Sequence, residues 1–185
     1  QAGEFLSYTD FKDDDILIFT DGDIRLQRRF TDEEIYLITS IQDNDLLAGP
    51  NATHSNNTLW NEANGLRRTC SDGYLQNLFR SFGLTGMEKT LNMGVIACNV
   101  ATFKKIHSTT YRVFKEFPEV TNHMARQQWY MNIAIYNQCN VKLLPFTFHS
   151  HPHNGDQEGL NFRGDKIYIY HTKVLFNHKY FERFQ

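Results

Sequence analysis

The stretch ILIFTDGDI, residues 16–24, decides how this sequence is interpreted. Its first four residues, Ile16–Phe19, are apolar, and all but one are β-branched or aromatic. Such a run is typical of a strand that is buried on both faces of an α/β sheet. Asp21-Gly22-Asp23 follows almost at once. Because the ligand crevice of an open α/β sheet lies outside the carboxyl ends of its strands, the stretch predicts a binding site at the end of this strand.

The chemistry of this site follows from its two carboxylates. Asp21 and Asp23 repel each other at this spacing unless a cation lies between them. A hard divalent ion fills that role and also binds the oxygens of a diphosphate. Gly22 keeps the backbone slim where a ligand approaches. The alternative is a solvated turn, because Asp and Gly are common turn residues, but the apolar run before the pair favours a metal site.

Strands and helices alternate through the rest of the chain. A capping box formed by Thr31 and Glu34 predicts a helix that runs to about Ser40. Asn99 is expected to cap a second helix and Asn122 a third. Further strands are predicted at residues 46–48, 91–98, 141–144 and 166–170. We therefore predict one α/β domain over residues 1–185, with a mixed, mostly parallel sheet flanked by helices.

Composition narrows the function classes. The 185 residues carry a net charge of −2, which gives no electrostatic reason to expect a nucleic acid partner. No apolar run approaches the roughly 18 residues of a membrane span. Three cysteines without CxxC spacing argue against a thiolate zinc site and favour a reducing compartment. Two N-glycosylation sequons, at Asn51 and Asn56, point to the secretory-pathway lumen instead, so the localisation stays open.

Residues 50–72 are polar, rich in Asn and without a clear periodicity. Long loops inside compact domains are usually functional or disordered. We expect this segment to be a loop on the acceptor side of the binding site. Near the other end of the chain, Lys166–Tyr170 predicts a strand that delivers His171, an imidazole able to complete a metal site.

Five segments, in this order, resemble the motifs of nucleotide-sugar-dependent glycosyltransferases of the GT-A type. Asp21-Gly22-Asp23 after its strand resembles the DxD motif of that family. Leu91–Ile96 is similar to its FNxGV strand, and Gln127–Asn132 is similar to its DQxxxN helix. Val141–Pro145 and Lys166–His171 are similar to the two strands that follow, the last of which ends in a metal-binding histidine. The resemblance covers nearly the whole chain and implies the GT-A (Rossmann-like) fold.

The resemblance implies a hexosyltransferase-type enzyme with two substrates. It would move a sugar from a UDP- or GDP-sugar donor to a glycan, a glycoconjugate or another hydroxyl acceptor. Mn²⁺ or Mg²⁺ would be the cofactor, held by Asp21, Asp23 and His171. Since such an ion neutralises the departing diphosphate, the leaving group needs no proton.

The remaining residues implied by the resemblance would contact the donor and the acceptor. Two would line the donor-sugar and acceptor pocket, three lie on the helix at the sugar, and one lysine would meet the diphosphate. They are Asn92, Gly94, Gln127, Gln128, Asn132 and Lys173.

The sequence departs from the family at the helix motif. Gln127 stands where the family has Asp, and an amide cannot act as a general base. An inverting mechanism would therefore need its carboxylate from Asp156, Glu158 or Glu62. A retaining, front-face route is compatible with the amide.

The sequence also departs from the family at its two ends. Val174 and Asn177 stand where the family's HxxGxxKPW ending has Gly and Lys, which leaves Lys173 or Lys179 for the diphosphate. A GT-A domain begins with a strand-helix-strand unit that binds the nucleotide base, whereas only 15 residues precede Ile16 here. We expect that unit to lie in the same protein, outside this sequence.

Two other functions fit parts of the pattern. A haloacid-dehalogenase-like phosphatase also uses DxD after a strand, with the first Asp as nucleophile, but it expects Gly-Thr where this chain has Ile24-Arg25. A non-catalytic, carbohydrate-binding GT-A-like domain would explain Gln127. Separately, histidines at 149, 151 and 153 would share one face of an extended chain, either as a zinc site or as a run of loop histidines.

Overall fold

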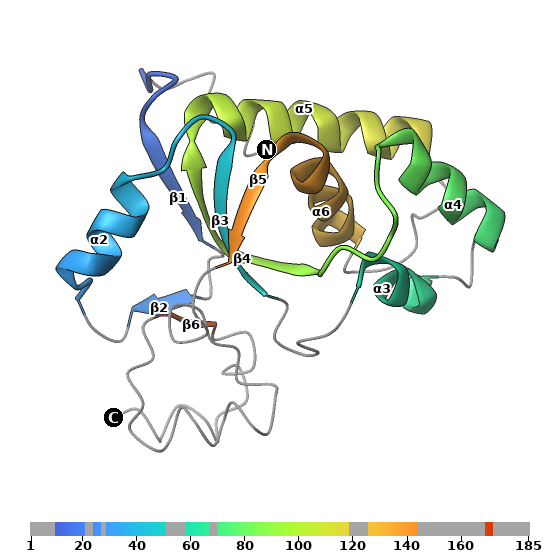
Figure 1. Cartoon of the computed structure of the whole chain (residues 1–185), viewed down its shortest axis with the longest axis horizontal. Coiled ribbons are helices and arrows are strands. Elements are labelled where there is room, and N and C mark those ends of the chain that lie inside the picture. The colour runs from blue at the N-terminus through green and yellow to red at the C-terminus, as the bar shows by residue number, and fades with distance from the viewer. Residues whose placement is uncertain are drawn as a thin grey trace, which may run out of the picture.

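A computed structural model describes residues 10–20, 24–26, 29–50, 58–66, 70–118, 126–143 and 169–171. At residues 24–26, 50, 64–66, 126 and 169–171 the description covers the backbone alone. Strands and helices alternate along the described chain (Figure 1). The elements are β1 (Ile16–Thr20), β2 (Ile24–Leu26), α2 (Asp32–Thr39), β3 (Asp45–Pro50), α3 (Leu59–Leu66), α4 (Asp72–Ser81), β4 (Leu91–Asn99), α5 (Val100–Glu116), α6 (Arg126–Gln138), β5 (Asn140–Leu143) and β6 (Ile169–His171).

Four strands form the main sheet in the order β1-β4-β3-β5. β4 is antiparallel to β1 and to β3, while β3 and β5 are parallel. β1, β3 and β5 therefore run in one direction and β4 runs against them, which confirms the predicted mixed α/β sheet. Because β4 lies between β1 and β3, two of the three strand pairs are antiparallel. β2 and β6 form a separate antiparallel pair below this sheet (Figure 1).

Helices cover both faces of the sheet. On one face, β3 and β4 side chains pack against α5 and α6 in a cluster that includes Leu46, Ile96, Phe103, Ile106 and Ile135. On the other face, Leu47, Val95 and Ala97 pack against Ile38 of α2 and Ile41 just after it. Neighbouring residues of β3 and β4 thus serve opposite faces, as the period-2 geometry of a strand requires. The central strands β3 and β4 are therefore buried between helices on both faces of the sheet.

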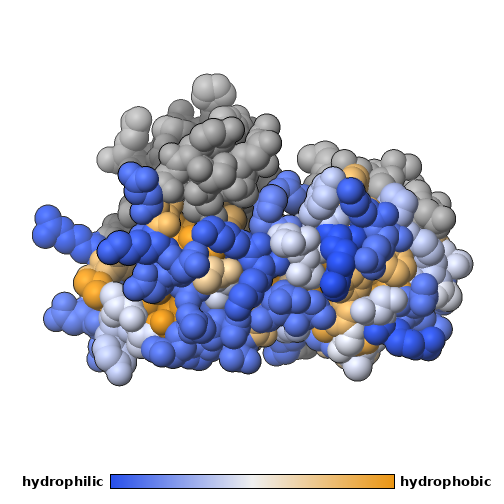
Figure 2. Space-filling view, turned by 90° about the horizontal axis from the view of Figure 1, so that it is seen from above, coloured by the Kyte–Doolittle hydropathy of each residue, from blue (hydrophilic) through white to orange (hydrophobic). Residues whose placement is uncertain are grey.

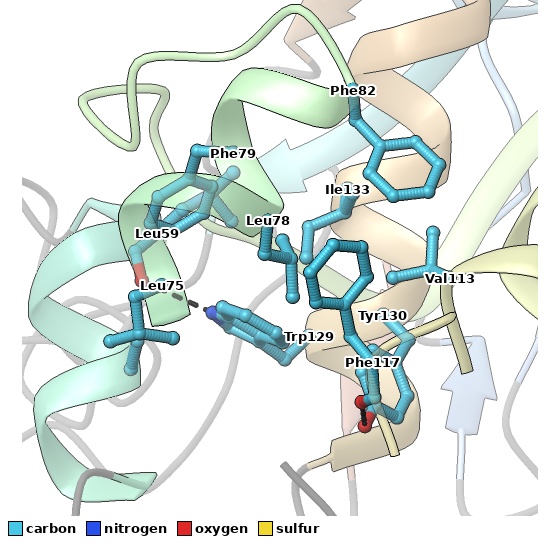
Figure 3. Close-up of a cluster of buried hydrophobic side chains, with 11 residues drawn as sticks. Leu59, Leu75, Leu78, Phe79, Phe82, Val113, Phe117, Trp129, Tyr130 and Ile133 are labelled. Carbon is cyan, nitrogen blue, oxygen red and sulfur yellow. Dashed lines mark hydrogen bonds between the residues drawn. The ribbon is translucent and has the colours of Figure 1, made fainter. Parts of the chain in front are cut away.

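A third cluster lies among the helices α3, α4, α5 and α6 (Figure 3). Trp129 lies at its centre, fully buried, and its indole N–H donates to the carbonyl oxygen of Leu59 at 3.1 Å. The hydroxyl of Tyr130 donates to the carbonyl oxygen of Phe117 at 2.9 Å. Each large aromatic residue therefore buries its ring and satisfies its polar group at the same time.

Two predicted helix starts are confirmed. Thr31 caps α2 in a full capping box, with Glu34 Oε2 accepting from the Thr31 backbone N–H at 2.8 Å. Asn99 caps α5, and its Oδ1 accepts from the Thr102 N–H at 2.8 Å. These caps satisfy N–H groups that have no partner inside the helix, which is why the two boundaries could be predicted.

Burial of β1 on both faces is a wrong prediction. Ile18 is 41% exposed, and Thr20 is exposed as well. β1 lies at one edge of the four-stranded sheet in the described part of the chain. An apolar run of four residues gives the strand but does not tell a central strand from an edge strand.

The loop predicted over residues 50–72 is also wrong in part. Residues 59–66 form α3, with Leu59 and Ala63 fully buried one helical turn apart. Thr58 Oγ1 accepts from the Asn61 N–H at 3.2 Å and so caps the start of α3. The Asn-rich composition of the segment gave no indication of this cap. Residues 51–57 and 67–69 lie outside the described residues. Because α3 contributes to the core, residues 59–66 are not part of an acceptor loop.

The structure also contains a helix, α4, that the sequence analysis does not predict. Ser71 caps it, and Leu75, Leu78 and Phe79 are buried at helical spacing. The cap expected at Asn122 and the strand residues 166–168 lie outside the described residues.

The surface around α5 is largely hydrophilic (Figure 2). Within the described residues, no helix combines the length and the hydropathy needed to cross a bilayer.

An ion pair between β3 and β5 leads to a first prediction. Lys142 Nζ lies 2.7 Å from Asp45 Oδ2, with the Asp45 side chain 7% and the Lys142 side chain 50% exposed. The hydrogen bond from Lys142 lowers the pKa of Asp45 from its usual 3.8, against the opposing effect of burial. A lowered pKa stabilises the fold above the unfolded value, and this contribution is lost as the pH falls through the folded value.

We therefore expect Asp45→Asn to lower the free energy of unfolding at neutral pH by at most about 1 kcal/mol, since half-exposed Lys142 is screened by water. The difference from the wild type should shrink as urea unfolding is repeated below about pH 4. Asp13→Asn, which removes an exposed pair with Lys104, is the matched control and should change little. A difference that is independent of pH would contradict the role given to the Asp45 charge.

Candidate functional site

One edge of the main sheet collects the ends of all four strands. Thr20, the last residue of β1, pairs with Val95, and Pro50, the last residue of β3, pairs with Leu91, the first residue of β4. Leu143, the last residue of β5, pairs with Ala48. The carboxyl ends of β1, β3 and β5 therefore point to the side of the sheet where β4 begins, although β1 ends opposite the middle of β4. The binding crevice of an open α/β sheet lies outside such an edge.

The strand pair β2–β6 lies on the same side of the molecule (Figure 1). Its register places Ile24 opposite His171, Arg25 opposite Tyr170 and Leu26 opposite Ile169. Residues 147 positions apart in the sequence are thus neighbours in space. Ile24 directly follows Asp23 in the chain, so the backbone of His171 pairs with the residue next to the predicted DxD motif.

The metal-binding role of Asp21, Asp23 and His171 stays a prediction. Asp21-Gly22-Asp23 lies outside the described residues, and His171 is described by its backbone alone. Among the described side chains, no group of three or more His, Cys, Asp or Glu is arranged to hold a metal ion.

β4 is irregular beside this edge. Ala48 and Gly49 are adjacent in β3, yet their partners in β4 are Ile96 and Asn92, so Met93–Val95 form an irregular segment between them. Asn92 is 6% exposed, and its Oδ1 accepts from the Gly94 N–H at 2.7 Å. The Asn92 side chain thereby satisfies a backbone donor inside the irregular segment. Such bulges are frequent next to active sites, where they re-aim side chains.

Asn132 connects α6 to the first residue of β4. Its Oδ1 accepts from the Leu91 N–H at 2.6 Å, and its Nδ2 donates to the carbonyl oxygens of Leu91 at 3.0 Å and Gln128 at 2.8 Å. The residue is fully buried. Its amide therefore has partners on both its oxygen and its nitrogen, and we assign it a positioning role at this edge.

Removing the Asn132 side chain leaves both backbone polar groups of Leu91 without their described partner. We expect Asn132→Ala to lower the free energy of unfolding by about 2–4 kcal/mol, because buried groups that lose their hydrogen bonds cost about 1–3 kcal/mol each. Urea unfolding measures the change. Asn137→Ala, which loses a half-buried bond to the carbonyl oxygen of Phe82 and a bond from the Gln138 side chain, is the control and should cost clearly less. Equal losses in the two variants would contradict the special place of Asn132.

The two glutamines in the first turn of α6 differ in their surroundings. Gln127 is exposed. Gln128 is half-buried, and its Nε2 lies 3.4 Å from Oε1 of Glu62 on α3. Of the carboxylates considered as substitutes for the missing Asp, Glu62 is the one within the described residues, and the structure brings it to the helix motif.

Two of the three cysteine thiols, those of Cys98 and Cys139, are unsuited to nucleophilic catalysis. Burial, with a smaller contribution from Cys139, raises the pKa of Cys98 to about 12. Burial likewise raises the pKa of Cys139 to about 12. Because the thiolate is the reactive form, neither group attacks a substrate near neutral pH.

The remaining candidates of the sequence analysis lie outside the described residues. They are Lys173 and Lys179, the carboxylates Asp156 and Glu158, the histidines His149, His151 and His153, and the departures Val174 and Asn177.

Solved structures share this arrangement of strands and helices. The chain is similar to the galactosyltransferase LgtC in complex with donor and acceptor sugar analogues, with a TM-score of 0.53 and 15% identity over 92% of this chain. An active-site mutant of LgtC, in which a glutamine is changed to glutamate, matches with a TM-score of 0.51, also at 15% identity over 92% of this chain. The described chain has the fold of GT-A glycosyltransferases.

The chain spans 56% of the length of LgtC in both of these matches. The bifunctional glycosyltransferase WbbM in its apo form is similar over 86% of this chain and 29% of its own, with 17% identity and a TM-score of 0.49. No protein-family model matches the chain, and the comparison with curated proteins finds no match either.

Proposed function

We propose that the protein is a metal-dependent glycosyltransferase that moves a sugar from a nucleoside diphosphate sugar to a hydroxyl acceptor. The pairing of Ile24 with His171 carries this proposal. It joins the strand after the DxD motif to the strand that ends in the histidine, and these segments lie far apart in the sequence. A common fold with LgtC, which was solved with donor and acceptor sugar analogues, supports the same assignment.

The residues at this place suit a divalent ion. Asp21 and Asp23 offer the carboxylate oxygens that Mn²⁺ and Mg²⁺ prefer, and His171 adds an imidazole. We propose that these three side chains hold the ion and that Gly22 leaves room for the diphosphate. A bound ion would neutralise the negative charge that develops on the departing nucleoside diphosphate.

The chain's own residues would orient the sugar. Gly94 lies in the irregular segment of β4 and Asn92 directly precedes that segment, and such bulges often re-aim side chains next to active sites. Asn132 holds the start of β4 against α6, which keeps this segment fixed. Gln128 would contact the donor sugar from the neighbouring helix. In LgtC an active-site glutamine was the residue changed to glutamate, which supports a glutamine in this role.

The proposed reaction does not require a base at Gln127 or Gln128. Amide side chains donate and accept hydrogen bonds but do not take up a proton near neutral pH. Sugar transfer with retention needs no separate protein base if the acceptor proton passes to the departing phosphate. The proposal therefore favours retention over inversion.

A donor hydrolysis assay tests this function. UDP- and GDP-sugars are offered with Mn²⁺ or with EDTA, and the released nucleoside diphosphate is measured. We expect release from one class of donor with Mn²⁺ and none with EDTA. Hydrolysis of a simple phosphate ester instead would indicate the phosphatase chemistry. Glycan binding without donor turnover would indicate a carbohydrate-binding domain.

A further inference from the structure

Glu62 and Gln128 form a contact between helices that the common family motifs do not describe. Glu62 belongs to α3, in a segment whose sequence suggested a loop, and Gln128 belongs to the first turn of α6. Gln128 Nε2 donates to Glu62 Oε1 at 3.4 Å in a partly buried environment. Close packing fixes both helices here, because Trp129, the next residue of α6, donates to the carbonyl oxygen of Leu59 on α3.

The contact lies beside the edge where the sheet strands end. The backbone oxygen of Gln128 accepts from Asn132, and the same Asn132 holds the N–H and C=O of Leu91. Asn92 follows Leu91 directly and bonds to Gly94. Hydrogen bonds, together with the covalent links within Gln128 and between Leu91 and Asn92, therefore connect Glu62 to the irregular segment of β4.

We propose that Glu62 is a positioning residue that fixes the orientation of the Gln128 amide toward the donor sugar. The inference rests on the proposed function. A primary amide has a donor end and an acceptor end, and a carboxylate accepts from the donor end only. Glu62 therefore binds the NH₂ group of Gln128 and leaves its carbonyl oxygen to accept a hydrogen bond from a sugar hydroxyl.

The effect of this orientation lies in the transfer step. An amide that rotates freely presents its NH₂ group and its oxygen in turn, so that a sugar hydroxyl meets the wrong partner part of the time. Small errors in the position of a reacting group can cost about a hundredfold in rate. Binding of the nucleotide, which we assign to the metal site, does not depend on this amide.

Three variants test the proposal. Glu62→Ala is expected to lower kcat for donor turnover by roughly tenfold to a hundredfold, with unchanged affinity for the nucleoside diphosphate in the presence of Mn²⁺. Glu62→Gln keeps an acceptor oxygen at this position and should recover most of kcat. Glu116→Ala removes an exposed carboxylate paired with Arg112 on α5 and should leave kcat unchanged.

A readout without turnover separates this proposal from the proposed function. The side-chain amide resonances of Gln128 in a ¹⁵N–¹H spectrum should shift and broaden in Glu62→Ala and stay near the wild-type position in Glu62→Gln. These spectra decide whether Glu62 orients Gln128 even if the wild type turns over no donor. Wild-type kcat and unchanged amide resonances in Glu62→Ala would overturn the proposal. A loss of kcat that Glu62→Gln does not recover would overturn it as well.

Discussion

Replacing Asp21 with alanine is expected to lower kcat/KM for the nucleotide sugar by about a thousandfold or more. A divalent ion that faces the leaving diphosphate contributes several kcal/mol to the transition state, and each 1.36 kcal/mol is a factor of about ten in rate. Asp23→Ala should have an effect of similar size. The measurement is the rate of nucleoside diphosphate release at saturating Mn²⁺, together with thermal unfolding of each variant.

Asp14→Ala is the matched control for this prediction. Asp14 is an exposed residue of the turn before β1, seven positions from Asp21. It should leave both turnover and unfolding temperature unchanged. If Asp21→Ala keeps full turnover and the control behaves as expected, the proposed role of the DxD motif in metal binding is contradicted.

Trp129→Ala should produce the largest loss of stability in the described chain, about 3–5 kcal/mol in the free energy of unfolding. The side chain is fully buried, and its ring lies 5.8 Å, centroid to centroid, from the rings of both Phe79 and Tyr130. Truncation creates a cavity among four helices and leaves the carbonyl oxygen of Leu59 without its described donor. Urea unfolding measures the loss.

Two further variants serve as an intermediate and as a surface control for this measurement. Trp129→Phe keeps an aromatic ring but loses the hydrogen bond to Leu59, so its cost should lie between those of the wild type and the alanine variant. Tyr36→Ala removes a side chain that is 73% exposed and should change stability by no more than about 0.5 kcal/mol. A loss below about 1 kcal/mol for Trp129→Ala would contradict the central position of this residue in the core.

Those parts of the fold that rest on local chemistry could be predicted from the sequence. The caps at Thr31 and Asn99 are read directly from side chains that satisfy free N–H groups of a helix. β1, β3, β4 and β5 were each predicted within two residues of the observed boundaries. Long apolar or β-branched runs with polar ends are strong local signals.

The structure differs from the prediction where packing outweighs composition. α3 lies in a polar stretch, and its Leu59 and Ala63 are buried because α6 presents Trp129 to them. Ile18 belongs to an apolar run and yet is exposed, because β1 lies at a sheet edge in the described chain. Which neighbour an element receives is a property of the tertiary structure, and a single sequence does not state it.

The candidate site shows the same division. Asn92 and Gly94 lie in β4, which pairs with the strand that precedes Asp21, and their contact with a donor sugar stays a prediction. Nothing in the sequence indicated that Asn132 is consumed by the backbone of Leu91, because a buried amide and a catalytic amide look alike in sequence. The contact of Gln128 with Glu62 joins residues 66 positions apart and became visible only in the structure.

The most direct test of the central claim is a calorimetric titration of the protein with UDP and with GDP, each with and without Mn²⁺. We predict that one of the two nucleotides binds only when Mn²⁺ is present, and that Asp21→Ala abolishes this binding while the protein stays folded. A folded protein that binds neither nucleotide, or binds one equally well without the metal, would contradict the account.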